Sequence, residues 1–205
     1  MVVIVDYGLG NLGSIKNMLQ FIGFDAVISS DRETISGATK LILPGVGSFD
    51  QGMTNLHEKE LVSVLNQRVL IDRVPILGIC LGMQLFGLKS EEGSLPGLSW
   101  IGQESKKFRP DNHQAFPVPH LGWEYVSGTN VQSRLLTGLD DETKFYFAHS
   151  YYVSCENRDE VILEANYIHP FDASVEKGNI AGVQFHPEKS HKYGMQLLTN
   201  FVTHF

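Results

Sequence analysis

The stretch that decides the fold is ILGICLGMQLF, residues 76–86, in which an apolar run gives way to a helix-like pattern at Cys80. Gly78 and Gly82 flank this cysteine in the form Gly-x-nucleophile-x-Gly. A sharp strand-to-helix turn lifts a side chain clear of a sheet, and small residues two positions away avoid collisions. A buried, inert cysteine between packing glycines has the same pattern and is common. The stretch therefore supports two hypotheses, a packed thiol or a nucleophile held at a turn.

Strand-like and helix-like segments alternate on both sides of this stretch. Short apolar runs predict strands, and segments with helical periodicity separate them. The predicted strands are 2–7, 26–29, 40–45 and 74–79, and the predicted helices are 11–23, 48–67 and one that begins near 81. Such alternation predicts a mostly parallel sheet that is covered by helices on both faces.

The pattern changes after about residue 97. Segment 116–123 is predicted to be an irregular loop, and 190–205 a closing helix with Ser190 as its N-cap. Gly178 and Asn179 are typical of a hairpin turn. Antiparallel strands are expected at 144–153, 161–166, 173–178 and 179–186. We therefore predict an α/β fold, with a mostly parallel central sheet flanked by helices and an antiparallel extension in the C-terminal half, as a single domain over residues 1–205.

The composition is that of a globular chain with a sizeable core. The chain has 205 residues, a hydrophobic fraction of 42% and a formal net charge of −7. This acidic balance argues against a nucleic-acid partner, which favours a basic face. The apolar runs are too short to span a membrane, and the N-terminus lacks the features of a signal peptide. With only Cys80 and Cys155 as cysteines, we expect free thiols and a cytoplasmic protein.

A second candidate site is VQFHPEKS, residues 183–190. His186 and Glu188 stand two positions apart, and on an extended segment such side chains project to the same side. A histidine backed by a carboxylate is the general base that a cysteine needs, because the carboxylate fixes the tautomer and stabilises the imidazolium. Alone, the motif also fits a surface turn. Together with Cys80, it predicts a catalytic triad.

A third candidate is the glycine-rich segment LPGVGSFD, residues 43–50, which directly follows a predicted strand. Glycines let backbone amides turn toward a ligand, and ligands bind beyond the carboxyl ends of parallel strands. The segment is thus placed to supply an oxyanion donor beside the amide of Leu81, which follows Cys80. A plain glycine-rich turn is the alternative.

A rival motif lies in DYGLGNLG, residues 6–13, which contains G-x-G-x-x-G after a strand and before a helix. Asp31 follows 18 residues after Gly13, in the outline of a dinucleotide fingerprint. An NAD-binding oxidoreductase is therefore an alternative. Against it, the segments after residue 97 offer no second nucleotide-binding half, and the Cys80 and 183–190 motifs would have no role.

Metal binding has a weaker signal. His120, His149 and His186 are the residue type that binds zinc, but their loops show no close ligand spacing. Cys155 lies in the polar stretch SCENRD and is interpreted as a bystander. We expect no metal ion and no organic cofactor.

Five motifs, taken in order, carry a family resemblance: PGVGSF, GICLGMQLF, PHLGW, YFAHSYY and GVQFHPEKS. Together they resemble the class I glutamine amidotransferases, and more closely the glutaminase subunits of imidazole glycerol phosphate synthase, an enzyme of histidine biosynthesis. The resemblance covers nearly the whole chain. It includes DYGLGN, which removes most of the case for NAD.

The resemblance implies a role for particular side chains. Cys80 corresponds to the nucleophile, His186 to the base and Glu188 to its orienting carboxylate. Val46 and Gly47, with Leu81, correspond to the oxyanion donors. The positions that hold L-glutamine are Gly47, Gln84, Glu92, Ser150 and Tyr151. Gln84 also fits from first principles, because it stands one helical turn after Cys80 on the same face.

The resemblance also implies a partner, a (β/α)8-barrel synthase subunit that receives ammonia in a heterodimer. Asn11, Pro119, His120 and Trp123 correspond to the interface. It further implies weak glutaminase activity in the subunit alone, with activation when the partner binds its nucleotide ligand.

Two features depart from the expected pattern: Glu124 stands where asparagine is expected, and segment 105–119 is longer. These features leave open a second client, a sugar amidotransferase of surface polysaccharide synthesis. A catalytically silent binding subunit is a further alternative, against which the intact triad argues.

Overall fold

A computed structural model describes residues 1–112, 114–129 and 132–205. The N-terminal part contains parallel strands at the positions that the apolar runs predict. They are β1 (Val2–Val5), β2 (Ala26–Ser29), β3 (Lys40–Gly45) and β4 (Ile76–Cys80). β1 pairs with β2 and β3, and β3 pairs with β4, so that Gly45 and Cys80 end their strands side by side.

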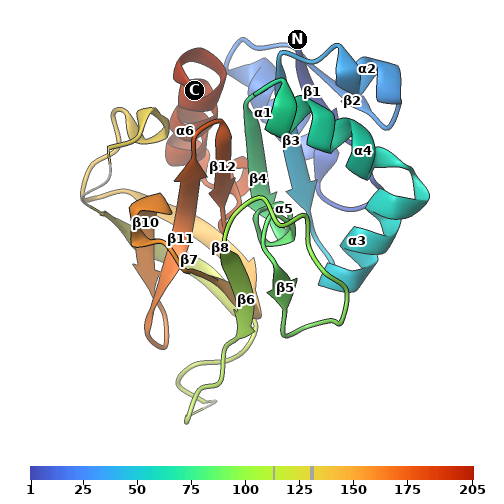
Figure 1. The fold of residues 1–205 in the computed structure, drawn as a ribbon. Coiled ribbons are helices and arrows are strands. Elements are labelled where there is room, and N and C mark those ends of the chain that lie inside the picture. The colour runs from blue at the N-terminus through green and yellow to red at the C-terminus, as the bar shows by residue number, and fades with distance from the viewer. Residues whose placement is uncertain (113, 130–131) are drawn as a thin grey trace.

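Helices cover both faces of this parallel region (Figure 1). One face packs against α2 (Arg32–Ser36), α3 (Phe49–Glu58) and α4 (Leu61–Asn66), which continues into a π-helical turn at Gln67–Ile71. The other face packs against α1 (Leu12–Phe21) and the C-terminal α6 (His191–His204). Each face buries its own apolar cluster, and every fully buried large side chain contributes about 1.5–3 kcal/mol. The two clusters hold the strand ends rigidly in place.

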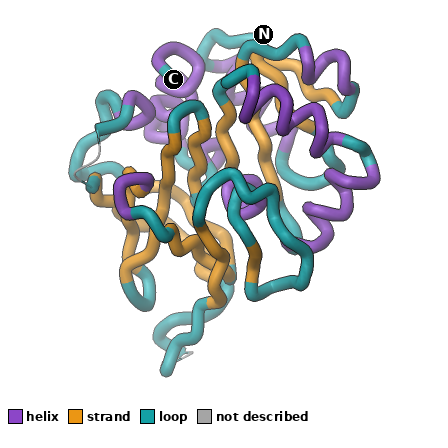
Figure 2. The backbone as a smooth tube through the Cα atoms, viewed as in Figure 1, coloured by secondary structure: helices purple, strands orange, loops and turns teal. Residues whose placement is uncertain are grey.

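The C-terminal half adds antiparallel strands, which lie mainly on the left and lower left in Figure 2. They are β7 (His120–Gly128), β8 (Lys144–His149), β9 (Tyr151–Cys155), β10 (Val161–Asn166) and β11 (Pro170–Lys177), with β5 (Lys89–Ser90) and β6 (Gln103–Lys107) before them. Short 3-10 turns occur at Arg134–Leu136, Arg158–Glu160 and Pro187–Lys189.

The two halves form one sheet because β12 (Ile180–Val183) pairs with both. It runs antiparallel to β11 and parallel to β4. In the described residues the strand order is β2-β1-β3-β4-β12-β11-β10-β7-β8, with β5, β6 and β9 off this path. This confirms the predicted α/β class with an antiparallel extension. It also places the segment after β12 beside the end of β4.

Two local predictions are wrong. Segment 116–123 is not all irregular, because β7 begins at His120 and pairs with β8. Its outward residues are apolar, so the alternation of a half-buried strand is hidden in the sequence. The predicted strand 144–153 is broken at Ser150, since β8 pairs with β7 whereas β9 pairs with β6 and β11.

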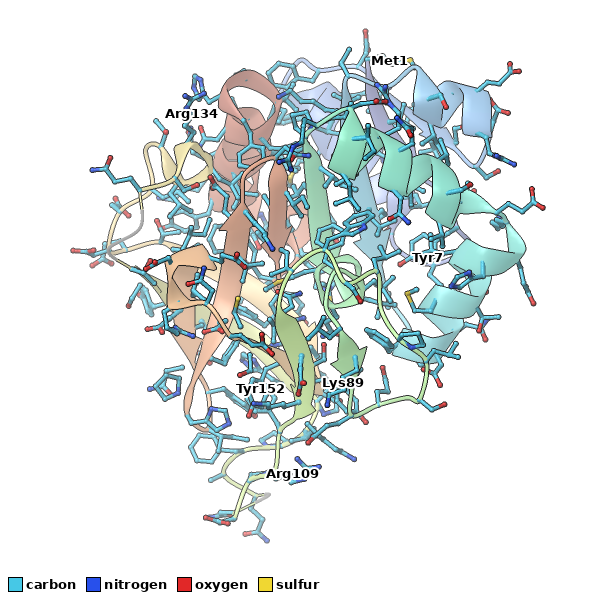
Figure 3. All side chains as sticks on the ribbon, viewed as in Figure 1. Met1, Tyr7, Lys89, Arg109, Arg134 and Tyr152 are labelled. Carbon is cyan, nitrogen blue, oxygen red and sulfur yellow. The ribbon has the colours of Figure 1, made fainter. Side chains whose placement is uncertain are left out.

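The described residues between β6 and β7, 108–112 and 114–119, project from the body of the molecule (Figure 1). Figure 3 shows Arg109 at this end of the molecule, near Lys89 and Tyr152, whereas Arg134 lies near the opposite end. Arg109 forms an ion pair with Glu91, in which the guanidinium of Arg109 donates to Glu91 Oε2 at 2.8 Å. In the part of the chain that the structure describes, no helix is long and apolar enough to cross a membrane.

Candidate active site

Cys80 ends β4 in an unusual backbone conformation, with φ of 54° and ψ of −110°. The chain then enters α5 (Leu81–Leu85), a short helix. Positive φ is rare for a residue with a side chain and persists only where the surroundings hold it. A Cβ at Gly82 would collide with the backbone of β3, and one at Gly78 would collide with the Phe86 ring. The two glycines therefore give the turn the clearance that the sequence pattern predicts.

His186 and Glu188 lie together beside Cys80, although the sequence-based reason is partly wrong. The pair does not occupy an extended segment, because β12 ends at Val183 and residues 187–189 form a 3-10 turn. His186 Nδ1 nevertheless lies 2.8 Å from Glu188 Oε1, and both side chains are almost fully buried. The tight turn achieves the same juxtaposition that an extended strand was expected to give.

The protonation state of His186 follows from its neighbours. Burial alone would lower the pKa of His186, but hydrogen bonds with Cys80 and Glu188 outweigh burial and raise the pKa to about 10. The histidine therefore favours its protonated form at neutral pH. A protonated imidazole next to a sulfur atom is suited to donate a proton to a leaving group.

Ser190 stands at the N-cap position of α6, as predicted, but its side chain has another role. Its hydroxyl makes no cap hydrogen bond to α6. Instead, Ser190 Oγ donates to the His186 carbonyl at 2.6 Å and accepts from the Tyr146 amide at 3.0 Å. The serine thus ties the turn that carries His186 and Glu188 to strand β8.

Two buried glutamines connect Cys80 to the neighbouring strands. Gln184 Nε2 donates to Cys80 Sγ at 3.6 Å, and Gln184 Oε1 accepts from Gln84 Nε2 at 3.0 Å. Gln84 Nε2 also donates to the Tyr151 carbonyl at 3.0 Å. Gln184 is not among the residues predicted from the sequence, although its place two residues before His186 is a usable signal. Hydrogen bonds to sulfur stabilise thiolate over thiol, so Gln184 is a functional candidate.

The predicted substrate and oxyanion positions line one cavity of about 190 Å³. Cys80 lies in its wall, and the carbonyl of Ala148 lies 3.9 Å from Cys80 Sγ. The lining residues are Val46, Gly47, Cys80, Leu81, Gln84, Glu92, Pro119, Ala148, His149, Ser150 and Tyr151. The cavity therefore brings together every residue predicted to hold glutamine or an oxyanion. A partly open space of this size fits a single amino acid.

The predicted oxyanion segment begins at Gly45, which is packed tightly from behind. A Cβ at Gly45 would collide with the Tyr7 hydroxyl and with Leu81. The Tyr7 hydroxyl itself is buried without a hydrogen-bond partner among the described residues, and burial raises the pKa of Tyr7. Val46 and Gly47 are exposed, in contrast, and Gly47 has φ of 139°. The segment thus has a fixed base and an open tip.

The four residues predicted to face a partner subunit have different environments. Trp123 is 38% exposed and stacks on His191 with ring centroids 5.6 Å apart. Pro119 is exposed at the cavity rim, and Asn11 is half-buried at the start of α1. His120 corrects the prediction, because its side chain is only 1% exposed. It points inward because it pairs with His149 across β7 and β8.

The geometry of the described residues supports neither the metal-binding nor the NAD-binding hypothesis. Within residues 1–112, 114–129 and 132–205, no group of three or more His, Cys, Asp or Glu side chains is arranged to hold a metal ion. Among the described residues, β7 to β11 make antiparallel pairs and only β12 pairs parallel, with β4, so this part of the sheet does not form the second nucleotide-binding half that NAD requires. Gly10 is explained by packing, because a Cβ there would press on Pro44.

Comparison with known families decides the class. Residues 3–205 match the family model of glutamine amidotransferase class I. The chain belongs to the class I glutamine amidotransferases. The five motifs that carry the resemblance lie close together around Cys80 and its cavity.

Individual relatives show which members of the class I glutamine amidotransferases this chain is similar to. It is 53% identical over 202 residues to imidazole glycerol phosphate synthase subunit HisH 2 of Methanococcus maripaludis, covering 98% of both chains. It is 49% identical to the subunit of the same name in Pseudomonas aeruginosa, again covering 98% of both. A solved glutamine amidotransferase superposes with a TM-score of 0.73 at 19% identity, covering 98% of this chain and 97% of that one. This last likeness concerns the fold alone.

Proposed function

We propose that this chain is the glutaminase subunit of an imidazole glycerol phosphate synthase, working in the cytoplasm. It hydrolyses L-glutamine to glutamate and ammonia. A (β/α)8-barrel partner, joined in a heterodimer, uses the ammonia to form imidazole glycerol phosphate and aminoimidazole carboxamide ribonucleotide in histidine biosynthesis. The observation that carries the proposal is the cavity that holds Cys80 beside the buried His186–Glu188 pair, in a chain with full-length relatives of this subunit name.

In the first half-reaction, Cys80 Sγ attacks the carboxamide carbon of glutamine. The hydrogen bond from Gln184 Nε2 stabilises the sulfur as thiolate, and the amides of Val46, Gly47 and Leu81 receive the developing oxyanion. Protonated His186 then gives its proton to the departing nitrogen, so that ammonia leaves and a glutamyl thioester remains. The raised pKa of His186 supports its role as the acid in this step.

In the second half-reaction, water attacks the thioester and His186 acts as base. Formation of the thioester removes the sulfur's negative charge, and with it one cause of the raised pKa of His186. The histidine is then free to accept a proton from water, while Glu188 keeps its ring oriented. The same side chain thus serves as acid and base in turn.

The cavity supports glutamine as the substrate. Glu92 lies in its wall and supplies a carboxylate for the ammonium group, while its Oε2 also accepts from the Phe49 amide at 2.8 Å. Both hydrogen bonds that the Gln84 side chain makes with described residues use Nε2, so its carbonyl oxygen is the atom proposed to accept from the substrate. Gly47, Ser150 and Tyr151 complete the wall around the amino-acid end.

The face of β7 around Trp123 supports the partner proposal. Leu121, Trp123 and Tyr125 alternate on the outer side of β7 and are all exposed. Two lysines lie close by: Lys144 lies over the Tyr125 ring at 5.5 Å, and Lys189 lies over the ring of Tyr146, which packs against Trp123, at 5.6 Å. Aromatic anchors ringed by polar groups are typical of protein interfaces. On a chain of net charge −7, this positive, apolar patch favours an acidic partner surface.

The test is reconstitution with the host's barrel synthase. The two subunits should co-purify, and the complex should form imidazole glycerol phosphate from glutamine, whereas the barrel alone should require added ammonium salts. Absence of complex formation with a folded barrel would contradict the assignment of the partner. Glutamine hydrolysis by the isolated chain would then still test the glutaminase assignment separately.

Three observations favour a different acceptor of the ammonia. Glu124 replaces the expected asparagine beside Trp123, segment 105–119 is longer than expected, and the two relatives carry the numeral 2 in their names. Such a paralogue would supply ammonia to a sugar amidotransferase of surface polysaccharide synthesis. Glutamine-dependent amidation of the sugar, together with failure to support the cyclase, would favour this client.

A further inference from the structure

A pair of buried histidines lies between the glutamine cavity and strand β7. His120 Nδ1 is 3.3 Å from His149 Nε2, and His149 Nδ1 is 2.8 Å from the Tyr151 carbonyl. Both rings are nearly inaccessible, with 1% and 6% of their residue surfaces exposed. The His120 ring stacks on Tyr167 with centroids 3.9 Å apart. The pair is therefore fixed in place and has no role in the proposed reaction.

The Tyr151 carbonyl determines where the protons of this pair lie. A carbonyl only accepts, so His149 Nδ1 must carry hydrogen. Burial lowers the pKa of His149 to about 3 and that of His120 to about 4, which keeps both rings neutral. In a neutral ring the other nitrogen is an acceptor, so His149 Nε2 accepts from His120 Nδ1. By the same rule, His120 Nε2 is left as an acceptor.

His120 Nε2 therefore needs a hydrogen-bond donor. It is buried without a hydrogen-bond partner among the described residues, and the group that faces it is Glu124 Oε1, at 3.5 Å. An ionised carboxylate and an unprotonated ring nitrogen are both acceptors, so the two would repel each other. A proton on Glu124 resolves the conflict. Burial raises the pKa of Glu124, which favours its protonated form.

We propose that Glu124 shares a proton with His120 Nε2, and that Glu124, His120 and His149 are positioning residues for the Tyr151 side of the glutamine cavity. The chain donates in one direction, from the carboxyl group through both rings to the Tyr151 carbonyl. That carbonyl also accepts from Gln84 Nε2 at 3.0 Å. The inference rests on the proposed function, because its effect is on glutamine binding.

The chain starts beside the exposed patch of β7 and ends at the substrate. Glu124 follows Trp123 in sequence, and its side chain is 33% exposed. Tyr151 and Gln84 both line the cavity. The strand that carries the exposed patch therefore also carries, on its opposite face, the first member of the proposed path to the glutamine site.

The proton arrangement is tested without any activity measurement, by nitrogen-15 NMR of the histidine rings at pH 7. The resonances are assigned from single His→Gln variants. Both His120 and His149 are expected as neutral Nδ1–H tautomers. Hydrogen on Nε2 of His120, or a charged His120, would reverse the chain and overturn the proposal. This result is independent of whether the protein hydrolyses glutamine.

Three variants of the full chain test the positioning role. Glu124→Gln keeps a donor toward His120 Nε2 and should leave KM for glutamine unchanged. Glu124→Val removes the donor and should raise KM roughly three- to tenfold with little change in kcat, the effect of one lost hydrogen bond. Glu176→Gln alters another partly buried carboxyl far from the cavity and should have no effect.

The opposite pattern would also overturn the proposal. An equal rise in KM for the Gln and Val variants would mean that Glu124 acts through charge and not as a donor. No rise in either variant would remove the positioning role. If the Val variant does not fold, as judged by circular dichroism, the NMR tautomers and the Gln variant still decide the matter.

Discussion

Gln184 Nε2 lies 3.6 Å from Cys80 Sγ, and the same amide group accepts from Gln84, so one buried side chain touches both the candidate nucleophile and a wall of the glutamine cavity. The contact joins β12 to the end of β4, the two strands that connect the halves of the sheet. We infer that Gln184 helps to hold the sulfur as thiolate. Its role can be separated from that of His186 by experiment.

Gln184→Leu should lower kcat for glutamine hydrolysis roughly 10- to 100-fold, because a hydrogen bond to a charged group is worth about 1.5–3 kcal/mol. Alkylation of Cys80 by iodoacetamide at pH 7 should slow in parallel. Gln51→Leu, on the exposed side of α3, is the matched control and should change neither rate. Unchanged alkylation in the Gln184 variant would show that the amide does not stabilise the thiolate.

The pH dependence of thioester formation should reflect His186. Its pKa is raised to about 10, above its ordinary value of 6.5. The stability that the protonated form contributes is therefore fully present below about pH 6.5. It is lost, together with the proton, as the pH rises through about 10. The ammonia burst, measured by rapid quench, should therefore fall as the pH passes about 10. Glu188→Gln removes a raising contribution and should move this fall to lower pH. A fall at the same pH in both proteins would contradict the role of Glu188.

Two glycine substitutions should have opposite effects on stability. Gly82→Ala places a methyl group against the backbone of β3, which no rotamer change relieves, and should lower the free energy of unfolding by about 3 kcal/mol or more. A Cβ at Gly13, within α1, would meet no atom within 4 Å. Gly13→Ala should therefore raise the free energy of unfolding by about 0.5–1 kcal/mol. Urea unfolding followed by circular dichroism measures both. A Gly82 variant as stable as the native chain would mean that the turn does not need clearance.

Trp123 should anchor the partner subunit. Trp123→Ala should weaken binding to the barrel synthase roughly 30-fold or more, the effect of a central aromatic anchor. Phe21→Ala removes a more exposed aromatic ring, 79% accessible at the far end of α1, and should have no effect. Calorimetric titration gives both affinities. Equal affinity for the native and Trp123 variant chains would place the interface elsewhere.

Part of this fold and site is predictable from the sequence because the relevant interactions are local. Apolar runs give the positions of β1 to β4, and the glycines around Cys80 give its turn. The start of β7 is hidden because Leu121, Trp123 and Tyr125 face outward, opposite to the usual pattern. The predicted strand 144–153 breaks at Ser150 because β8 and β9 pair with different strands.

The contacts that the sequence does not reveal are long-range. Gln84 and Gln184 are 100 positions apart, and only the parallel pairing of β4 with β12 brings them together. The family resemblance implies that His120 faces a partner, together with the rest of the 119–123 loop. On a strand, however, neighbouring residues point to opposite faces, and the odd positions of β7 are the outward ones.

The most direct test of the central claim is glutamate formation by the Cys80→Ala variant, measured in complex with the nucleotide-bound partner. We expect the native complex to turn over far faster than the isolated subunit, and Cys80→Ala to abolish turnover while glutamine still binds with nearly native affinity. Cys155→Ala is the matched control and should keep full activity, since Cys155 lies on β9 and outside the cavity lining. Full glutamine turnover by the Cys80 variant would contradict the assignment of Cys80 as the nucleophile.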